Sequence, residues 1–212
     1  MDVVRLKKDM KSHIGGCKEE LARMNVGSSL WGIGARRNAY RITKKHTGSG
    51  STTQAAVYKV LHPALALHII PVEYDWANPL VKRDGSPPHV IWHHAAANNL
   101  TPQAIHAYDI HTNGWSGFGY HFYVRKDGKV YRGRPEAYMG AHARGYNDSL
   151  GVCAEGNFMS DYMPIAQLNA MKALHYYLHH KYPRATDLRH KDVNATACPG
   201  LHYPMEKIMT SK

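Results

Sequence analysis

Residues 89–97, HVIWHHAAA, form an apolar run that has the length of a single strand. Continuous apolar runs of this kind are typical of strands that are covered on both faces of a sheet. Such strands occur mainly in proteins in which strands and helices alternate along the chain. This stretch therefore predicts an α/β domain whose sheet lies in the interior.

The segments that follow this run alternate in the expected way. Thr101-Pro102 is a favoured cap-then-proline start, and it predicts a helix over residues 102–111. Residues 119–134, GYHFYVRKDGKVYRGR, predict two strands that are joined across Asp127-Gly128, which is a strong hairpin signal. Residues 149–157, SLGVCAEGN, predict a second buried strand.

Residues 164–180 predict a helix that lays one face on the sheet. Its apolar residues recur at helical spacing: Leu168, Met171, Leu174 and Leu178. We interpret its three histidines as solvated side chains rather than metal ligands: His175, His179 and His180. A short strand over residues 187–190, a loop through Gly200 and a helix from about Tyr203 complete the domain. The whole pattern predicts a mixed central β-sheet flanked by helices.

The first third of the chain differs in charge from the rest. Residues 1–70 hold 12 Lys and Arg against 4 Asp and Glu, a net charge of +8 out of +11 for the chain. We expect residues 1–70 to be a small, basic, mainly helical segment, with helices over 3–24 and 53–67, and residues 71–212 to be the main domain. A basic segment is attracted to nucleic acid, anionic membranes and anionic wall polymers alike, so charge alone does not choose among them.

Several classes of protein are excluded by simple sequence features. The longest apolar stretch, residues 55–72, is interrupted by charged and polar residues and by Pro63, so no membrane span is expected. The amino terminus lacks the apolar region of a secretory signal, so nothing marks the chain for ordinary export. The three cysteines are too few for a disulfide framework, and their odd number makes one of them a candidate ligand.

Residues 189–200, RHKDVNATACPG, bring a histidine and a cysteine close together in the sequence. His190 and Cys198 are eight residues apart, and a short loop between them can fold back so that both side chains face one point. Histidine and cysteine together are an accepted ligand set for zinc. On spacing alone, a buried free cysteine beside an ordinary histidine is an equal alternative.

Four ordered blocks, residues 89–97, 119–128, 140–157 and 189–200, carry a family resemblance. Together they resemble the zinc-dependent N-acetylmuramoyl-L-alanine amidases, the family that unites amidase-type phage lysozymes with animal peptidoglycan recognition proteins. The resemblance implies that Zn²⁺ is the cofactor and that His93, His190 and Cys198 are its ligands. Strand alternation puts His94 on the face opposite to His93, so we expect His94 to be a packed or hydrogen-bonded neighbour.

The resemblance also implies two catalytic residues. Tyr120 is expected near the reacting water, where it would orient or deprotonate it. Thr196 stands where the family carries lysine or threonine, and its hydroxyl can donate a hydrogen bond to an oxyanion without supplying positive charge. Another branch of the family has a carboxylate at the position that matches Cys153, so Tyr120 is favoured for assisting the water and Glu155 is a second candidate.

The block of residues 140–147, GAHARGYN, is expected to line the substrate groove. His142, Arg144 and Asn147 offer donors to carbonyl and carboxylate groups of glycan or peptide. Asn147 could equally hold a turn.

The implied activity is hydrolysis of the amide between N-acetylmuramic acid and L-alanine in bacterial peptidoglycan. The expected setting is a phage endolysin that waits in the host cytoplasm until lysis and then acts on the cell wall, with a virion lysin or an autolysin as alternatives. The alternative from another class is a non-catalytic peptidoglycan-binding protein, which typically lacks the cysteine ligand. Residues 1–70 are candidates for binding anionic wall polymers, and no nucleic-acid partner is expected because no base-stacking motif accompanies them.

Overall fold

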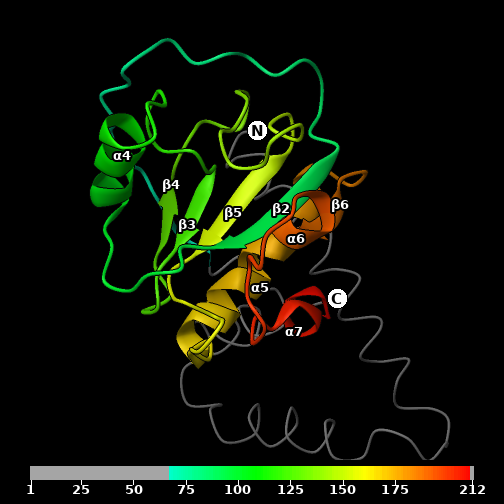
Figure 1. Cartoon of the computed structure of the whole chain (residues 1–212). Helices are drawn as coiled ribbons and strands as arrows, with labels where there is room; N and C mark the ends of the chain where they lie inside the picture. Colours follow the sequence, from blue (N-terminus) through cyan, green and yellow to red (C-terminus); the bar gives the residue numbers. More distant parts are fainter. Residues whose placement is uncertain (1–66, 211–212) are drawn as a thin grey trace, which may run out of the picture. The chain divides into compact units, whose positions relative to one another are not determined.

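Six strands form one sheet in the computed structural model, which describes residues 67–210 (Figure 1). Their order across the sheet is β1-β4-β3-β5-β2-β6. The strands are β1 (Ile69–Ile70), β2 (His89–His94), β3 (Phe122–Val124), β4 (Val130–Arg132), β5 (Leu150–Ala154) and β6 (Thr186–Arg189). Only β3 and β4 pair in antiparallel fashion, and the other pairs are parallel. The mixed α/β sheet predicted from the sequence is confirmed.

Strand β2 lies inside the sheet between β5 and β6. Its register places His93 opposite Cys153 of β5 and Trp92 opposite Arg189 of β6. All of its residues except His89 are buried, as the apolar run predicts. The hairpin predicted across Asp127-Gly128 is also confirmed, since it joins β3 to β4, and Gly128 has the positive φ of +85° that this turn requires.

The helices cover both faces of the sheet (Figure 1). They are α4 (Pro102–His111), α5 (Ile165–Lys181), α6 (His190–Val193) and α7 (Met205–Met209). Thr101 caps α4 as predicted, with its hydroxyl accepting from Ala104 N–H at 3.1 Å. None of the described helices has the length and apolar character that a membrane span requires.

Two apolar clusters hold these layers together. The larger joins α5 and α7 to alternate strand residues that include Val90 and Trp92. The smaller lies on the other face, where Ile105 of α4 meets Tyr123 and Cys153. Because neighbouring strand residues point to opposite faces, His93 lies on the α4 side and Trp92 on the α5 side.

Helix α5 confirms the predicted apolar stripe but corrects the interpretation of its histidines. Met171, Leu174 and Leu178 are fully buried against the sheet, and Leu168 packs beside them. His180 is exposed, as expected. His175 and His179 are not solvated: both are partly buried with their Nε2 atoms against Asp187, because β6 runs beneath this face of the helix.

The predicted segment of residues 1–70 lies almost entirely outside the described residues, together with its helices over 3–24 and 53–67. Its boundary with the main domain stays a prediction. Within the described part, Ile69 and Ile70 form β1 and pair with β4, so the sheet includes these two residues.

Candidate metal centre and active site

Three potential metal ligands from distant parts of the sequence converge at one end of β2. One ligand atom each from His93, His190 and Cys198 lies within 4.8 Å of the others. The rings of His93 and His190 are 4.5 Å apart between centroids, and Cys198 Sγ lies 3.8 Å from His93 Nδ1. A tetrahedral zinc with ordinary Zn–S and Zn–N bonds separates sulfur from nitrogen by about 3.6 Å. The spacing therefore fits a zinc ion.

The loop after α6 brings Cys198 to this point. His190 is the first residue of α6, directly after β6, and Lys191 N–H donates to Cys198 O at 2.9 Å. The loop then passes the backbone of Phe158 so closely that a Cβ at Gly200 would collide with it. Glycine at this position, with φ of +106°, lets the chain turn away after the cysteine. The loop between His190 and Cys198 thus folds back and brings the two side chains together, as their spacing in the sequence predicts.

Hydrogen bonds fix which nitrogen of His93 faces the cysteine. His142 Nε2 lies 3.2 Å from Ser149 O, and a carbonyl only accepts, so His142 Nε2 carries the proton. His142 Nδ1 must then accept from His93 Nε2 at 3.0 Å. Burial lowers the pKa of His93 well below its ordinary value and that of His142 to about 4, so both rings are neutral near pH 7. The unprotonated Nδ1 of His93 is therefore the atom that faces Cys198.

A second chain of hydrogen bonds acts on His190 in the same way. Asn194 Nδ2 donates to Arg144 O at 3.1 Å, which leaves Asn194 Oδ1 as the acceptor for His190 Nε2 at 3.1 Å. His190 Nδ1 is therefore unprotonated and available to bind a metal ion. Carbonyl and amide partners of this kind orient metal-ligating histidines in many proteins. Asn194 was not predicted from the sequence, although its place four residues after His190 was a visible signal.

The surroundings of Cys198 fit a bound cation. Burial raises the pKa of its thiol to about 11, while His94 N–H, which points at Sγ from 3.4 Å, lowers it. A metal ion favours the thiolate and deprotonates a coordinating thiol outright. His94 itself is buried, and its Nδ1 accepts from Phe158 N–H at 3.1 Å, which confirms the packed role expected for it.

Tyr120 lies beside the three ligands, just before β3. Its ring centroid is 5.1 Å from that of His93. Burial first, and then the nearby Cys153 and Cys198 thiols, raise the pKa of Tyr120 well above its ordinary value. The phenol is therefore protonated near neutral pH, which suits it to donating a hydrogen bond rather than to removing a proton.

Thr196 is exposed in the loop that carries Cys198. Its Oγ1 accepts from Cys198 N–H at 3.2 Å. A hydroxyl that accepts in this way retains its own proton for donation. The contact holds Thr196 beside Cys198.

The three predicted substrate residues occupy different environments. Asn147 Oδ1 accepts from His142 N–H at 2.9 Å and from Ala143 N–H at 3.1 Å, so it holds the turn that the sequence analysis considered as its other role. His142 is buried and uses both ring nitrogens behind His93. Arg144 is exposed. Their contacts with substrate stay predictions.

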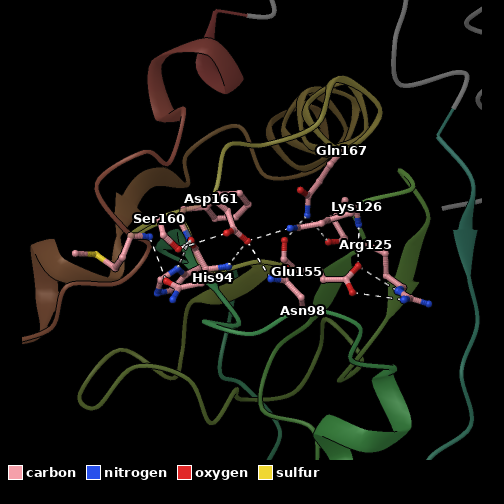
Figure 2. Close-up of polar contacts among 12 residues, drawn as sticks. His94, Asn98, Arg125, Lys126, Glu155, Ser160, Asp161 and Gln167 are labelled. Atoms are coloured by element: carbon pink, nitrogen blue, oxygen red, sulfur yellow. Dashed lines mark hydrogen bonds and ion pairs between the residues drawn. The ribbon is translucent and has the colours of Figure 1, made fainter.

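Glu155 is engaged away from the three ligands. Its carboxylate accepts from Arg125 Nε at 3.2 Å and from Lys126 N–H at 2.9 Å, as Figure 2 shows. Gln167 of α5 donates to the backbone oxygen of the same residue. These contacts tie Glu155 to the β3–β4 hairpin.

Comparisons with known proteins identify the family of this chain. The family described as N-acetylmuramoyl-L-alanine amidase matches residues 83–201. The solved endolysin amidase LysCS from Clostridium intestinale URNW is 46% identical, with a TM-score of 0.64, over 66% of this chain and 92% of that chain.

The chain is also similar in sequence to phage endolysins and to animal peptidoglycan-recognition proteins. The endolysin of Enterobacteria phage K11 is 40% identical over 93 residues, which are 41% of this chain and 61% of the endolysin. Peptidoglycan-recognition protein SC2 of Drosophila melanogaster is 33% identical over 127 residues, 53% of this chain and 67% of that protein. The chain thus spans about three fifths of the length of the curated endolysins it matches. Since the family match covers more than half of the sequence, the chain belongs to the N-acetylmuramoyl-L-alanine amidase family.

Proposed function

We propose that this protein is a zinc-dependent peptidoglycan hydrolase that cleaves the amide between N-acetylmuramic acid and L-alanine. The observation that carries the proposal is the convergence of His93, His190 and Cys198. Both imidazoles present an unprotonated Nδ1, and the buried thiol requires a cation to ionise. Two nitrogens and one sulfur leave a fourth tetrahedral position open, as catalytic zinc sites do.

The similarity to endolysins and recognition proteins supports peptidoglycan as the substrate. LysCS is an endolysin amidase, and the solved recognition protein LE, 25% identical with a TM-score of 0.60, is bound to tracheal cytotoxin, a monomeric diaminopimelic acid-type peptidoglycan. Retention of Cys198 favours an enzyme over a non-catalytic binding protein. Arg144, exposed beside the site, has the charge to pair with a carboxylate of the peptide stem.

Zinc, Tyr120 and Thr196 would each have a separate role in the hydrolysis. Zinc, when bound, supplies a Lewis acid that polarises the scissile carbonyl and activates water near neutral pH. The protonated Tyr120 donates a hydrogen bond that orients the attacking water, and Thr196 donates to the oxyanion that forms on the carbonyl oxygen. Water adds to the carbonyl carbon, the C–N bond breaks, and the amino group of L-alanine leaves with a proton.

The experiment that tests this function is digestion of purified sacculi with the full-length protein. We expect the digestion to release new L-alanine amino termini. This release should stop when a chelator removes the metal and should resume when zinc is added. Binding to sacculi without any release of amino termini would reject the enzyme in favour of the peptidoglycan-binding alternative.

The biological setting that we propose is phage-induced lysis. The similarity to phage endolysins supports it. In this setting the protein stays in the host cytoplasm until the membrane is breached and then reaches the cell wall. The basic residues 1–70 would add attraction to anionic wall polymers.

A further inference from the structure

A second cluster of metal-ligating side chains lies on the other face of the sheet. His175 and His179 extend from α5 toward Asp187 of β6, and one ligand atom of each lies within 4.8 Å of the others. Asp187 contacts Trp92, which points away from the face that carries His93. We propose that His175, His179 and Asp187 bind a second divalent transition-metal ion of the zinc class, separate from the catalytic centre.

The helix presents both imidazoles to the same point. Residues four apart lie on one face of a helix, and pairs of histidines at this spacing are a recurrent zinc-binding arrangement. The rings of His175 and His179 are 4.5 Å apart between centroids. Their Nε2 atoms lie 3.1 Å and 2.8 Å from the same oxygen, Oδ2 of Asp187. Ligand atoms on a tetrahedral zinc are about 3.3 Å apart, so small side-chain adjustments admit an ion.

The contact between His179 and Asp187 is not a well-directed hydrogen bond. The two atoms are 2.8 Å apart, yet His179 Nε2 is buried and forms no hydrogen bond of good geometry among residues 67–210. Buried polar atoms in native proteins nearly always have a partner, so such an atom requires an explanation. A cation between the imidazoles and the carboxylate would satisfy it.

A hydrogen bond from Trp92 orients the Asp187 carboxylate toward the two imidazoles. Trp92 Nε1–H donates to Asp187 Oδ1 at 2.8 Å, which fixes the carboxylate and leaves Oδ2 facing the two imidazoles. Hydrogen bonds of this kind orient the ligands of metal sites. Two imidazoles and one carboxylate suit zinc, and the partly exposed His179 leaves a side through which the ion can enter.

An ion at this position would join α5 to the strand that leads into the catalytic centre. Asp187 lies in the strand that leads directly into His190 at the start of α6. Binding would tie this strand to α5 and stabilise the folded protein, since a ligand that binds only the folded state raises its stability.

The test uses cobalt(II) titration of the metal-free, full-length protein, followed by absorption spectroscopy. Cobalt bound to Cys198 gives a thiolate charge-transfer band, whereas cobalt bound by His175, His179 and Asp187 gives only d–d absorption. We expect Asp187→Asn and His179→Gln each to bind one equivalent fewer than the unchanged protein and to keep the charge-transfer band. His180→Gln, on the exposed neighbour in α5, is the matched control and should bind the full number.

Other histidines that bind cobalt contribute equally to all these variants, so the difference of one equivalent is the decisive quantity. Cys198→Ser should lose the charge-transfer band and retain the equivalent that His179→Gln loses, which separates this site from the catalytic one. If Asp187→Asn does not fold, His179→Gln decides alone, because its side chain lies nearer the surface. Equal cobalt binding by His179→Gln and the unchanged protein would overturn the proposal and leave a simple His–Asp contact.

Discussion

His93 Nε2 donates to His142 Nδ1 across 3.0 Å, and this bond determines the proton position on the metal-facing histidine. Without it, either nitrogen of His93 could carry the proton, and a proton on Nδ1 would prevent that atom from binding a metal. We therefore expect His142 to act as a positioning residue, and its predicted place in the substrate groove is the alternative. The bond leads to a specific expectation about metal affinity.

We expect His142→Ala to weaken zinc binding at the catalytic centre by about 10-fold to 100-fold, as loss of a partner to a metal-ligating histidine commonly does. Zinc competition with a chromophoric chelator measures the change. Activity at saturating zinc should recover in large part, because His142 does not touch the reacting atoms in this role. Unchanged zinc affinity with lost activity would instead support the predicted contact with substrate.

The sheet was the most predictable part of the molecule. The run at residues 89–97 and the Asp127-Gly128 turn are local signals, and each produced the expected element because local preference and tertiary packing agree. The convergence of His93, His190 and Cys198 was also predictable, but only because the family resemblance singled out His93 from sixteen histidines.

The contacts around the site could not be read from the sequence because they depend on pairings across the fold. Asn194 acts on His190 only when α6 forms and the loop with Arg144 comes alongside. His175 and His179 were interpreted as solvated because an isolated helix offers no sign that Asp187 lies beneath it. Nothing in local sequence reports the strand order that brings β6 next to β2.

Cys198→Ser should lower the zinc content of the protein by one equivalent, because the serine hydroxyl is a far weaker ligand than a thiolate. Elemental analysis of both proteins, purified and dialysed in the same way, measures this directly. Peptidoglycan cleavage should fall with the metal. Full metal content in the variant would remove Cys198 from the site.

Tyr120→Phe should keep zinc and lose much of the cleavage rate. The substitution preserves the ring that packs 5.1 Å from His93 and removes only the hydroxyl that we propose orients the water. Losing one such hydrogen bond in the transition state commonly costs about 100-fold in rate or more. The rate is measured as release of L-alanine amino termini from purified sacculi, with zinc content as the control. A rate close to that of the unchanged protein would reject the role.

Thr196→Ala should likewise keep zinc and reduce turnover by about 100-fold, since it removes a donor to the oxyanion. The loop also loses the acceptor for Cys198 N–H, so a second variant is needed. Thr196→Ser retains the hydroxyl and should retain most of the activity. Equal activity in the alanine and serine variants would show that the hydroxyl does not act on the substrate.

The last prediction concerns residues 1–70, whose net charge of +8 is the clearest functional feature of that segment. If they bind anionic wall polymer, added salt should weaken binding of the full-length protein to intact walls, because exposed charges are screened over about 10 Å at 0.1 M salt. Deletion of residues 1–66, which retains Ile69 and Ile70 of β1, should weaken wall binding in low salt. Cleavage of a small soluble muramoyl peptide should survive, since every proposed site residue lies in the part that is kept.

Wall binding is measured by co-sedimentation, and unchanged binding by the shortened protein would reject the targeting role. A shortened protein that does not fold, as circular dichroism would report, would make residues 1–66 a part of the amidase domain itself.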